Sequence, residues 1–227
     1  MKFDGFVPES FDFLLELGFH NEKAYFESRR EDYERWIHQP LIALEEGLAP
    51  EVLAADPRVR TGKRSISRIY RDTRFSKDKS PIRDHMWIAY KQQEKRLSES
   101  FCFYFEINPV GYIYGMGMYD ADPAFMAALR ARGLAHTARL EALLSDPAFR
   151  RDFRLQGKDY ARPKVEGVSH VVAELLNKRY VSVVHSSNDI AAACSGALLE
   201  ELKQAIHRLT PLYRFIQGLD VGGTSSS

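Results

Sequence analysis

Residues 101–118 of this chain have the sequence FCFYFEINPVGYIYGMGM. In residues 101–107 every odd-numbered residue is Phe or Ile, and Cys, Tyr and Glu stand between them. This alternation is typical of a strand with one apolar face. The following Asn-Pro-Val-Gly, residues 108–111, has the composition of a tight turn. The stretch therefore predicts a β-hairpin whose second strand is residues 112–118, and so an antiparallel sheet.

The segments around this hairpin alternate between helical and extended patterns. We expect helices at residues 8–18, 22–39, from Pro40 onward, 122–144, 146–154, 170–177 and 189–216, and further strands at residues 66–72, 86–90 and 180–185. The sequence thus predicts a single α+β domain over residues 3–217, an antiparallel sheet with helices packed on it. Residues 218–227 are small and polar, and we expect a disordered tail.

Composition limits the classes of function. The 227-residue chain has a formal net charge of +1, which argues against a generally basic nucleic-acid-binding protein. Attraction to an anion must therefore come from a local patch. Cys102 and Cys194 are far apart in apolar surroundings, which favours reduced thiols. No membrane-spanning run is present, so we expect a cytoplasmic protein with no membrane partner.

The densest cluster of charge is at residues 68–81, RIYRDTRFSKDKSP. Cations alternate there with Asp72 and Asp78, and the Ser and Asp residues before Pro81 favour a turn or short loop. Such a loop is either exposed or built as a paired ionic network, because an unpaired buried charge costs several kcal/mol, roughly.

The same run, R-D-x-R-F-S-x-D-K-S-P from Arg71 to Pro81, is similar to the signature of a bacterial and fungal family of conserved domains of unknown function. The resemblance extends over most of residues 3–215 and implies no activity. Smaller matches are Gly5-Phe6, Asn21 with Tyr25-Phe26, Tyr33, Pro40, Gly115-Met116-Gly117 and Leu129-Arg130, and departures are His20, Tyr25 and Ile82-Arg83.

We hypothesise that the Arg71–Pro81 loop binds an anion, since arginine offers a planar fork and lysine a point charge for a phosphate or carboxylate. The ligand would be a small anionic molecule or nucleotide. The candidate ligand-binding residues are Arg71, Asp72, Arg74, Ser76, Asp78, Lys79, Ser80, Asn21 and Arg130. Asn21 has a second interpretation as the N-cap of helix 22–39.

Three alternatives stay open. The protein could hydrolyse its ligand, with Asp72 or Asp78 as the base. It could be a nucleic-acid-associated protein that uses the basic surface of residues 58–83. It could also be a non-catalytic structural or interaction domain in which the charged run is a buried ion-pair network.

Other features leave questions for the structure. No cofactor or metal is predicted: Asp72, Asp78 and His85 could supply ligands, but the neighbouring cations disfavour another positive ion. Gly115 and Gly117 mark a bulge, a helix-packing groove, or close approach of a ligand or another backbone. The sequence does not tell whether a second basic segment, residues 158–164, joins the first, or what the oligomeric state is.

Overall fold

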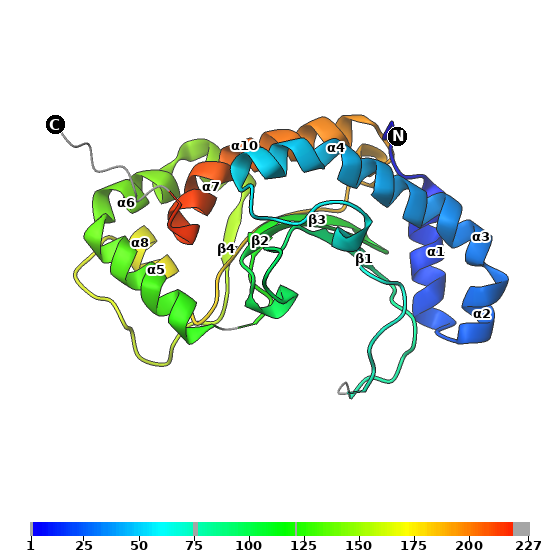
Figure 1. Cartoon of the computed structure of the whole chain (residues 1–227), viewed down its shortest axis with the longest axis horizontal. Helices are drawn as coiled ribbons and strands as arrows, with labels where there is room; N and C mark the ends of the chain where they lie inside the picture. Colours follow the sequence, from blue (N-terminus) through cyan, green and yellow to red (C-terminus); the bar gives the residue numbers. More distant parts are fainter. Residues whose placement is uncertain (1, 75–76, 121, 220–227) are drawn as a thin grey trace.

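The hairpin of residues 101–118 lies at the centre of an antiparallel sheet in the computed structural model, which describes residues 2–74, 77–120 and 122–219. The turn Pro109-Val110 joins its two strands, and their register runs from Cys102 opposite Gly117 to Asn108 opposite Gly111. The sheet order is β1-β2-β3-β5-β4 (Figure 1). The strands are β1 Met86–Ala89, β2 Cys102–Asn108, β3 Gly111–Gly117, β4 Arg154–Gln156 and β5 Ser182–Ser187.

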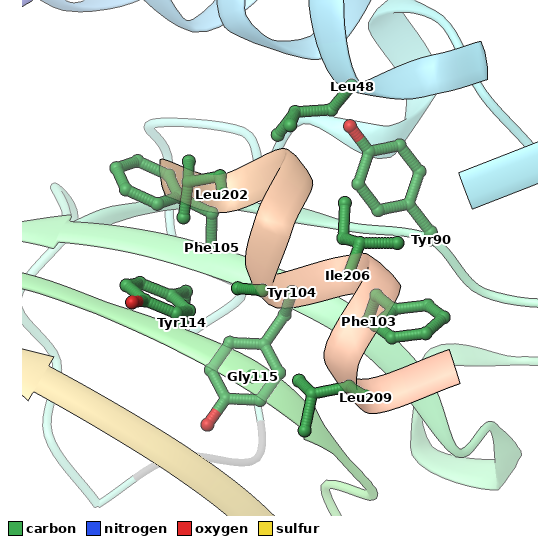
Figure 2. A pocket seen from close by; sticks show the side chains of 11 residues that line it. Leu48, Tyr90, Phe103, Tyr104, Phe105, Tyr114, Gly115, Leu202, Ile206 and Leu209 are labelled. Carbon is green, nitrogen blue, oxygen red and sulfur yellow. The ribbon is translucent and has the colours of Figure 1, made fainter. Parts of the chain in front are cut away.

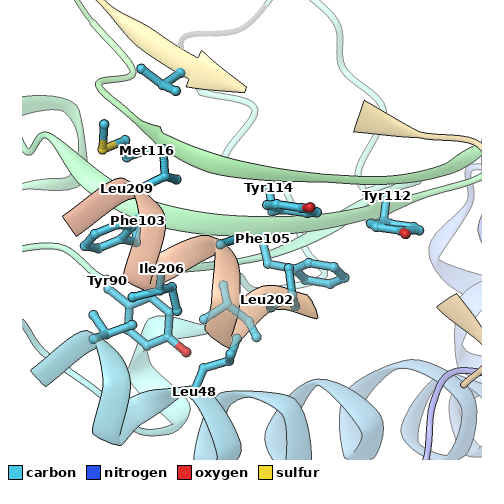
Figure 3. Packing of buried hydrophobic residues seen from close by; sticks show 14 of the residues in the cluster. Leu48, Tyr90, Phe103, Phe105, Tyr112, Tyr114, Met116, Leu202, Ile206 and Leu209 are labelled. Carbon is cyan, nitrogen blue, oxygen red and sulfur yellow. The ribbon is translucent and has the colours of Figure 1, made fainter. Parts of the chain in front are cut away.

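Two long helices, α4 (Gln39–Ala55) and α10 (Ala197–Gln217), run side by side over one face of the sheet (Figure 1). Phe103 and Phe105 of β2 and Tyr114 of β3 pack on this side and are buried (Figure 3). Each such side chain stabilises the fold by roughly 1.5–3 kcal/mol when it is fully buried. The helices contribute the facing residues Leu48, Leu202, Ile206 and Leu209.

A small cavity remains between α10 and the sheet, where Tyr90, Phe103 and Leu209 are among the lining residues (Figure 2). Its volume is about 20 Å³, which is room for roughly one water molecule. Because the lining is almost entirely apolar, it offers a water few partners. This cavity is a packing defect of the core and too small for a ligand.

The remaining helices form two groups at opposite ends of the sheet (Figure 1). One group is α1 Pro8–Phe19, α2 Lys23–Ser28, α3 Arg30–Tyr33 and a π-helical segment Glu34–His38 that continues into α4. The other is α5 Pro123–Ala135, α6 Thr137–Ser145, α7 Pro147–Asp152 and α8 His170–Leu176, and the short α9 Ile190–Ala193 precedes α10. The predicted single α+β domain is confirmed. Among the described helices, none combines the length and apolar character needed to cross a membrane.

Three predicted helices are interrupted. The helix expected at residues 22–39 breaks at Arg29, the one at 122–144 at His136, and the one at 189–216 between α9 and α10. At the first break, the Arg29 guanidinium binds Glu16 of α1 and Asp32 of α3, contacts distant in sequence. The apolar periodicity of the sequence continues through such breaks, so the sequence pattern does not reveal them. The three-residue β4 was missed because it is too short to show alternation.

The strand predicted at residues 66–72 is wrong. Only isolated pairings join this segment to the chain that returns from the loop, Ile66 with Ile88 and Tyr70 with Ile82. The returning side uses more residues between the same two pairings, so a continuous ladder cannot form.

The predicted tail lies mostly at 220–227, outside the described residues. Gly218 and Leu219 still belong to the end of α10, because the Leu219 N–H donates to the Arg214 carbonyl over 2.9 Å and Gly218 adopts a left-handed conformation.

Gly115 should be intolerant of substitution, because β5 passes so close that a Cβ atom would lie 1.9 Å from the Val183 carbonyl oxygen. We expect Gly115→Ala to lower the free energy of unfolding by about 3 kcal/mol or more, measured by chemical denaturation. The control is Gly167→Ala, where φ is +74° but nothing lies within 4 Å, and where we expect a loss of about 1–2 kcal/mol. Equal losses in the two variants would contradict this account.

Candidate functional site

The charged run forms a projecting loop, described over residues 66–74 and 77–85, which we call the charged arm. It leaves the outer edge of β1 and lies beside α1 (Figure 1). Its two sides are joined by a few backbone hydrogen bonds, from Arg71 N to Pro81 O over 2.9 Å and from Arg83 N to Ile69 O over 2.9 Å. Tyr70 packs its ring against Phe26 of α2 and donates to Glu27.

Asn21 fastens the arm to the N-terminal helices. Its Nδ2 donates to the carbonyls of Leu17, at 3.0 Å, and Ile82, at 2.8 Å, and its Oδ1 accepts the Ile82 N–H at 2.9 Å. The predicted N-cap role is wrong, since α2 begins after Glu22 and has no side-chain cap. Because the amide of Asn21 donates to and accepts from backbone groups of α1 and the arm, it positions the arm.

The tip of the arm is an exposed network of ion pairs. Arg71 pairs with Asp78 at 2.5 Å, and Arg74 makes a two-pronged contact with Asp72, at 2.9 Å and 2.7 Å. Lys79 donates to the Thr73 carbonyl over 2.8 Å. The Asp78 and Asp72 side chains are 52% and 45% exposed, so the expectation of a buried network is not met.

These contacts lower the basicity of both carboxylates. Hydrogen bonds from Arg74 lower the pKa of Asp72 to about 2. Hydrogen bonds from the Ser80 side chain and backbone, together with Arg71, lower the pKa of Asp78 to about 2. A group with such a low pKa is a weak general base near neutral pH.

A basic cleft lies at the base of the arm, on the outer side of β1, and its volume is about 530 Å³. Among its lining residues are six cations and one carboxylate, that of Asp72. The cations are Arg60, Lys63, Arg64, Arg68, Arg83 and Lys91, and Tyr70, Trp87 and Leu97 are among the other lining residues. The structure thus gathers positive charge from residues 60–68, from Arg83 and from Lys91 around one concave surface.

The charges of the cleft are poorly neutralised within the chain. In the described parts of the chain, Lys63, Arg64 and Arg68 have no carboxylate within ion-pair distance, and the buried Nε of Arg60 has no hydrogen-bond partner. Burial, with the positive charge of Arg71 and Arg68 nearby, lowers the pKa of Arg83. Burial and Arg60 lower the pKa of Lys91. A lowered pKa in a cation shows that its surroundings disfavour positive charge, and a bound anion would offset this.

One wall of the cleft is aromatic. The guanidinium of Arg83 lies over the Trp87 ring, 4.4 Å from its centre, and the His85 ring stacks on Trp87 at 5.5 Å. Alternate residues of an extended segment share one face, which places these three side chains together. The Trp87 ring thus holds the Arg83 charge at the cleft.

A buried carboxylate supports the turn that carries Lys63 and Arg64. Glu45 of α4 is 2% exposed and accepts the Gly62 N–H over 2.7 Å. Gly62 adopts φ +86° just before the short 3₁₀ turn Lys63–Ser65, which carries two cations of the cleft. Burial raises the pKa of the Glu45 carboxyl. Glu45 therefore positions the turn from beneath.

The predicted site residues divide into separate groups. The tip brings together Arg71, Asp72, Arg74, Asp78, Lys79 and Ser80, while Ser76 lies outside the described residues. Arg130 of α5 lies at the other end of the molecule, over the Tyr160 ring. The two basic segments do not meet, because residues 158–164 lie with α5 (Figure 1).

Sequence reasoning missed the cleft cations as a unit. The excess of Arg and Lys at residues 58–83 was a signal. Lys91 and Trp87 join them only because β1 pairs with β2 and turns its outer edge toward Ser67, whose N–H donates to the Trp87 carbonyl over 2.8 Å. Among the described residues, no three His, Cys, Asp or Glu side chains gather to hold a metal ion.

Comparison with known families matches residues 9–215 to the family described as conserved hypothetical protein (DUF2461). A search of curated proteins finds no match.

Asn21 should matter more for the stability of the fold than the ion pairs it helps to place. Asn21→Ala leaves both backbone groups of the fully buried Ile82 without partners, and we expect a loss of about 1–3 kcal/mol in unfolding free energy. Faster hydrogen exchange of the Ile82 amide would accompany it. Arg71→Ala removes an exposed pair and should cost about 1 kcal/mol or less. The reverse order of the two losses would contradict this anchoring role.

Proposed function

The chain belongs to the conserved hypothetical protein family DUF2461, and we propose that it binds a phosphate-bearing small molecule, such as a nucleotide or sugar phosphate, in the basic cleft at the base of the charged arm. The observation that carries the proposal is that the described lining residues place six cations and one carboxylate around a concave space of about 530 Å³. Pockets for small ligands have volumes of roughly 300–1,000 Å³.

The chemistry of the lining favours phosphate. Arginine can bind two phosphate oxygens with its planar fork, and lysine adds a compact charge. Arg68 and Arg64 are exposed and lie with Lys63 along the cleft, so they can reach a ligand at little cost in desolvation. The positive charges of the cleft repel one another, and a ligand with two or more negative charges would relieve this repulsion.

This proposal moves the expected site from the tip to the base of the arm. At the tip, Arg71 and Arg74 are engaged with Asp78 and Asp72, so an anion would have to compete with those carboxylates. At the base, Asp72 is the one carboxylate among the described residues that line the cleft. The tip then serves as a rim of the cleft.

We propose binding in preference to hydrolysis. The expected bases, Asp72 and Asp78, have pKa values of about 2 and would take up a proton poorly at neutral pH. We also place the protein in the cytoplasm; the free thiols of Cys102 and Cys194 support a reducing compartment.

The test is calorimetric titration with inorganic phosphate, sugar phosphates and nucleotides at fixed ionic strength. We expect saturable binding, weakened about tenfold by Arg68→Gln, because a charge-assisted hydrogen bond is worth roughly 1.5–3 kcal/mol. Lys95→Gln removes an equal charge from an exposed position that does not line the cleft, and it should leave the affinity unchanged.

One further variant tests the location of the site, and one further outcome tests the proposal itself. Arg74→Gln tests the tip: a loss of binding there, with Arg68→Gln unaffected, would move the site to the tip. If no phosphate ligand binds at millimolar concentration, the proposal fails and a structural or protein-interaction role of the arm gains support.

Nucleic-acid binding is the second candidate, because five of the six cleft cations belong to the basic stretch of residues 58–83. A backbone that contacted many of these cations would bind a single-stranded oligonucleotide with an affinity that falls steeply between about 50 and 200 mM salt. We expect the affinity to fall this steeply with salt only if the protein binds several phosphates of the oligonucleotide. A salt dependence as shallow as that of inorganic phosphate would favour the small ligand.

A further inference from the structure

The second basic segment, residues 158–164, forms a separate cluster with α5 that the cleft does not use. The Arg130 guanidinium lies over the Tyr160 ring, 5.5 Å from its centre, and the Lys164 ammonium lies 5.2 Å from the same centre. The two charges can therefore be no farther apart than the sum of those distances. From these contacts we infer a second anion site, formed by Arg130, Tyr160 and Lys164 and taking a phosphate monoester group.

A donor of this cluster is left unused. The Nη1 of Arg130 is buried and has no hydrogen-bond partner among the residues that the structure describes. A buried guanidinium N–H without an acceptor costs free energy, which an incoming oxyanion would restore. In the described parts of the chain, neither Arg130 nor Lys164 has a carboxylate within ion-pair distance. The ring face of Tyr160 attracts both cations but cannot accept the in-plane hydrogen bonds of the guanidinium.

Hydrogen bonds with Asn177 and one ion pair hold the segment in place. The Asn177 Oδ1 at the end of α8 accepts the N–H groups of Lys164, at 2.6 Å, and Val165, at 2.9 Å, and its Nδ2 donates to the Val165 carbonyl at 3.0 Å. The Asn177 carbonyl also accepts the Tyr160 N–H at 3.1 Å. An ion pair of 3.0 Å between Asp159 and Lys178 fixes the start of the segment.

Charge selects the ligand class. Two unneutralised cations suit a dianion better than a monoanion, which favours a phosphate monoester over a carboxylate. Both cations of the site contact the Tyr160 ring, so the site recognises the phosphate group itself through charge.

The test is a phosphate titration followed by NMR of arginine Nε–H groups, with inorganic phosphate and methyl phosphate as probes at constant ionic strength. The resonances of Arg130 and Arg83 report the two sites separately. We expect a saturable shift of Arg130 that follows its own binding curve and weakens about tenfold in Lys164→Gln. Lys158→Gln removes the same charge from an exposed position of the segment without ring contact and should leave the curve unchanged.

The outcomes separate this site from the cleft. A phosphate-dependent shift of Arg83 with none of Arg130 overturns the second site and leaves the proposed function standing. Equal weakening by Lys158→Gln and Lys164→Gln would show general attraction to a basic surface and would also overturn it. Lys164 is exposed, so its replacement tests the site even if Arg130→Gln proves too unstable to purify.

Discussion

Burial of one face of the β2–β3 hairpin against α10 is the interaction on which the rest of the structure depends. Phe103, Phe105 and Tyr114 remove a large aromatic surface from water, and α4 lies beside α10 over the same sheet. The close approach of β5 at Gly115 extends this sheet to β4, and β1 extends it on the other side. Both basic regions are attached to elements of this layer or to the helices at its ends.

The two basic segments bury only a few apolar side chains, among them Ile69 and Ile82 of the arm. Each is also fastened by one asparagine from a neighbouring helical region: Asn21 binds both backbone groups of Ile82, and Asn177 binds the backbone of Lys164 and Val165. A short amide that donates and accepts can satisfy two backbone groups at once. An asparagine side chain thus positions a polar loop at each end of the sheet.

The tip and the base of the charged arm differ in how far their cations are paired with carboxylates. At the tip, alternating signs along the chain let each arginine reach a nearby carboxylate, and the resulting ion pairs are exposed. At the base, chain segments that are each mainly basic come together with little acidic compensation. Unbalanced charge around a concave surface is what a phosphate ligand needs, whereas the ion pairs at the tip mainly hold the loop in its own shape.

The sequence by itself determined the α+β class, the central hairpin and most helices, because alternation and periodicity are local properties of Phe101–Met118 and the helical segments. It also indicated two basic segments. Only the tertiary structure decided that Asn21 holds the arm in place and does not cap a helix, and that the arm is not a strand. It also decided that Arg130 lies against Tyr160 and not against the arm. The physical reason is that these roles depend on which backbone groups and charges lie opposite each other, and those partners are distant in sequence.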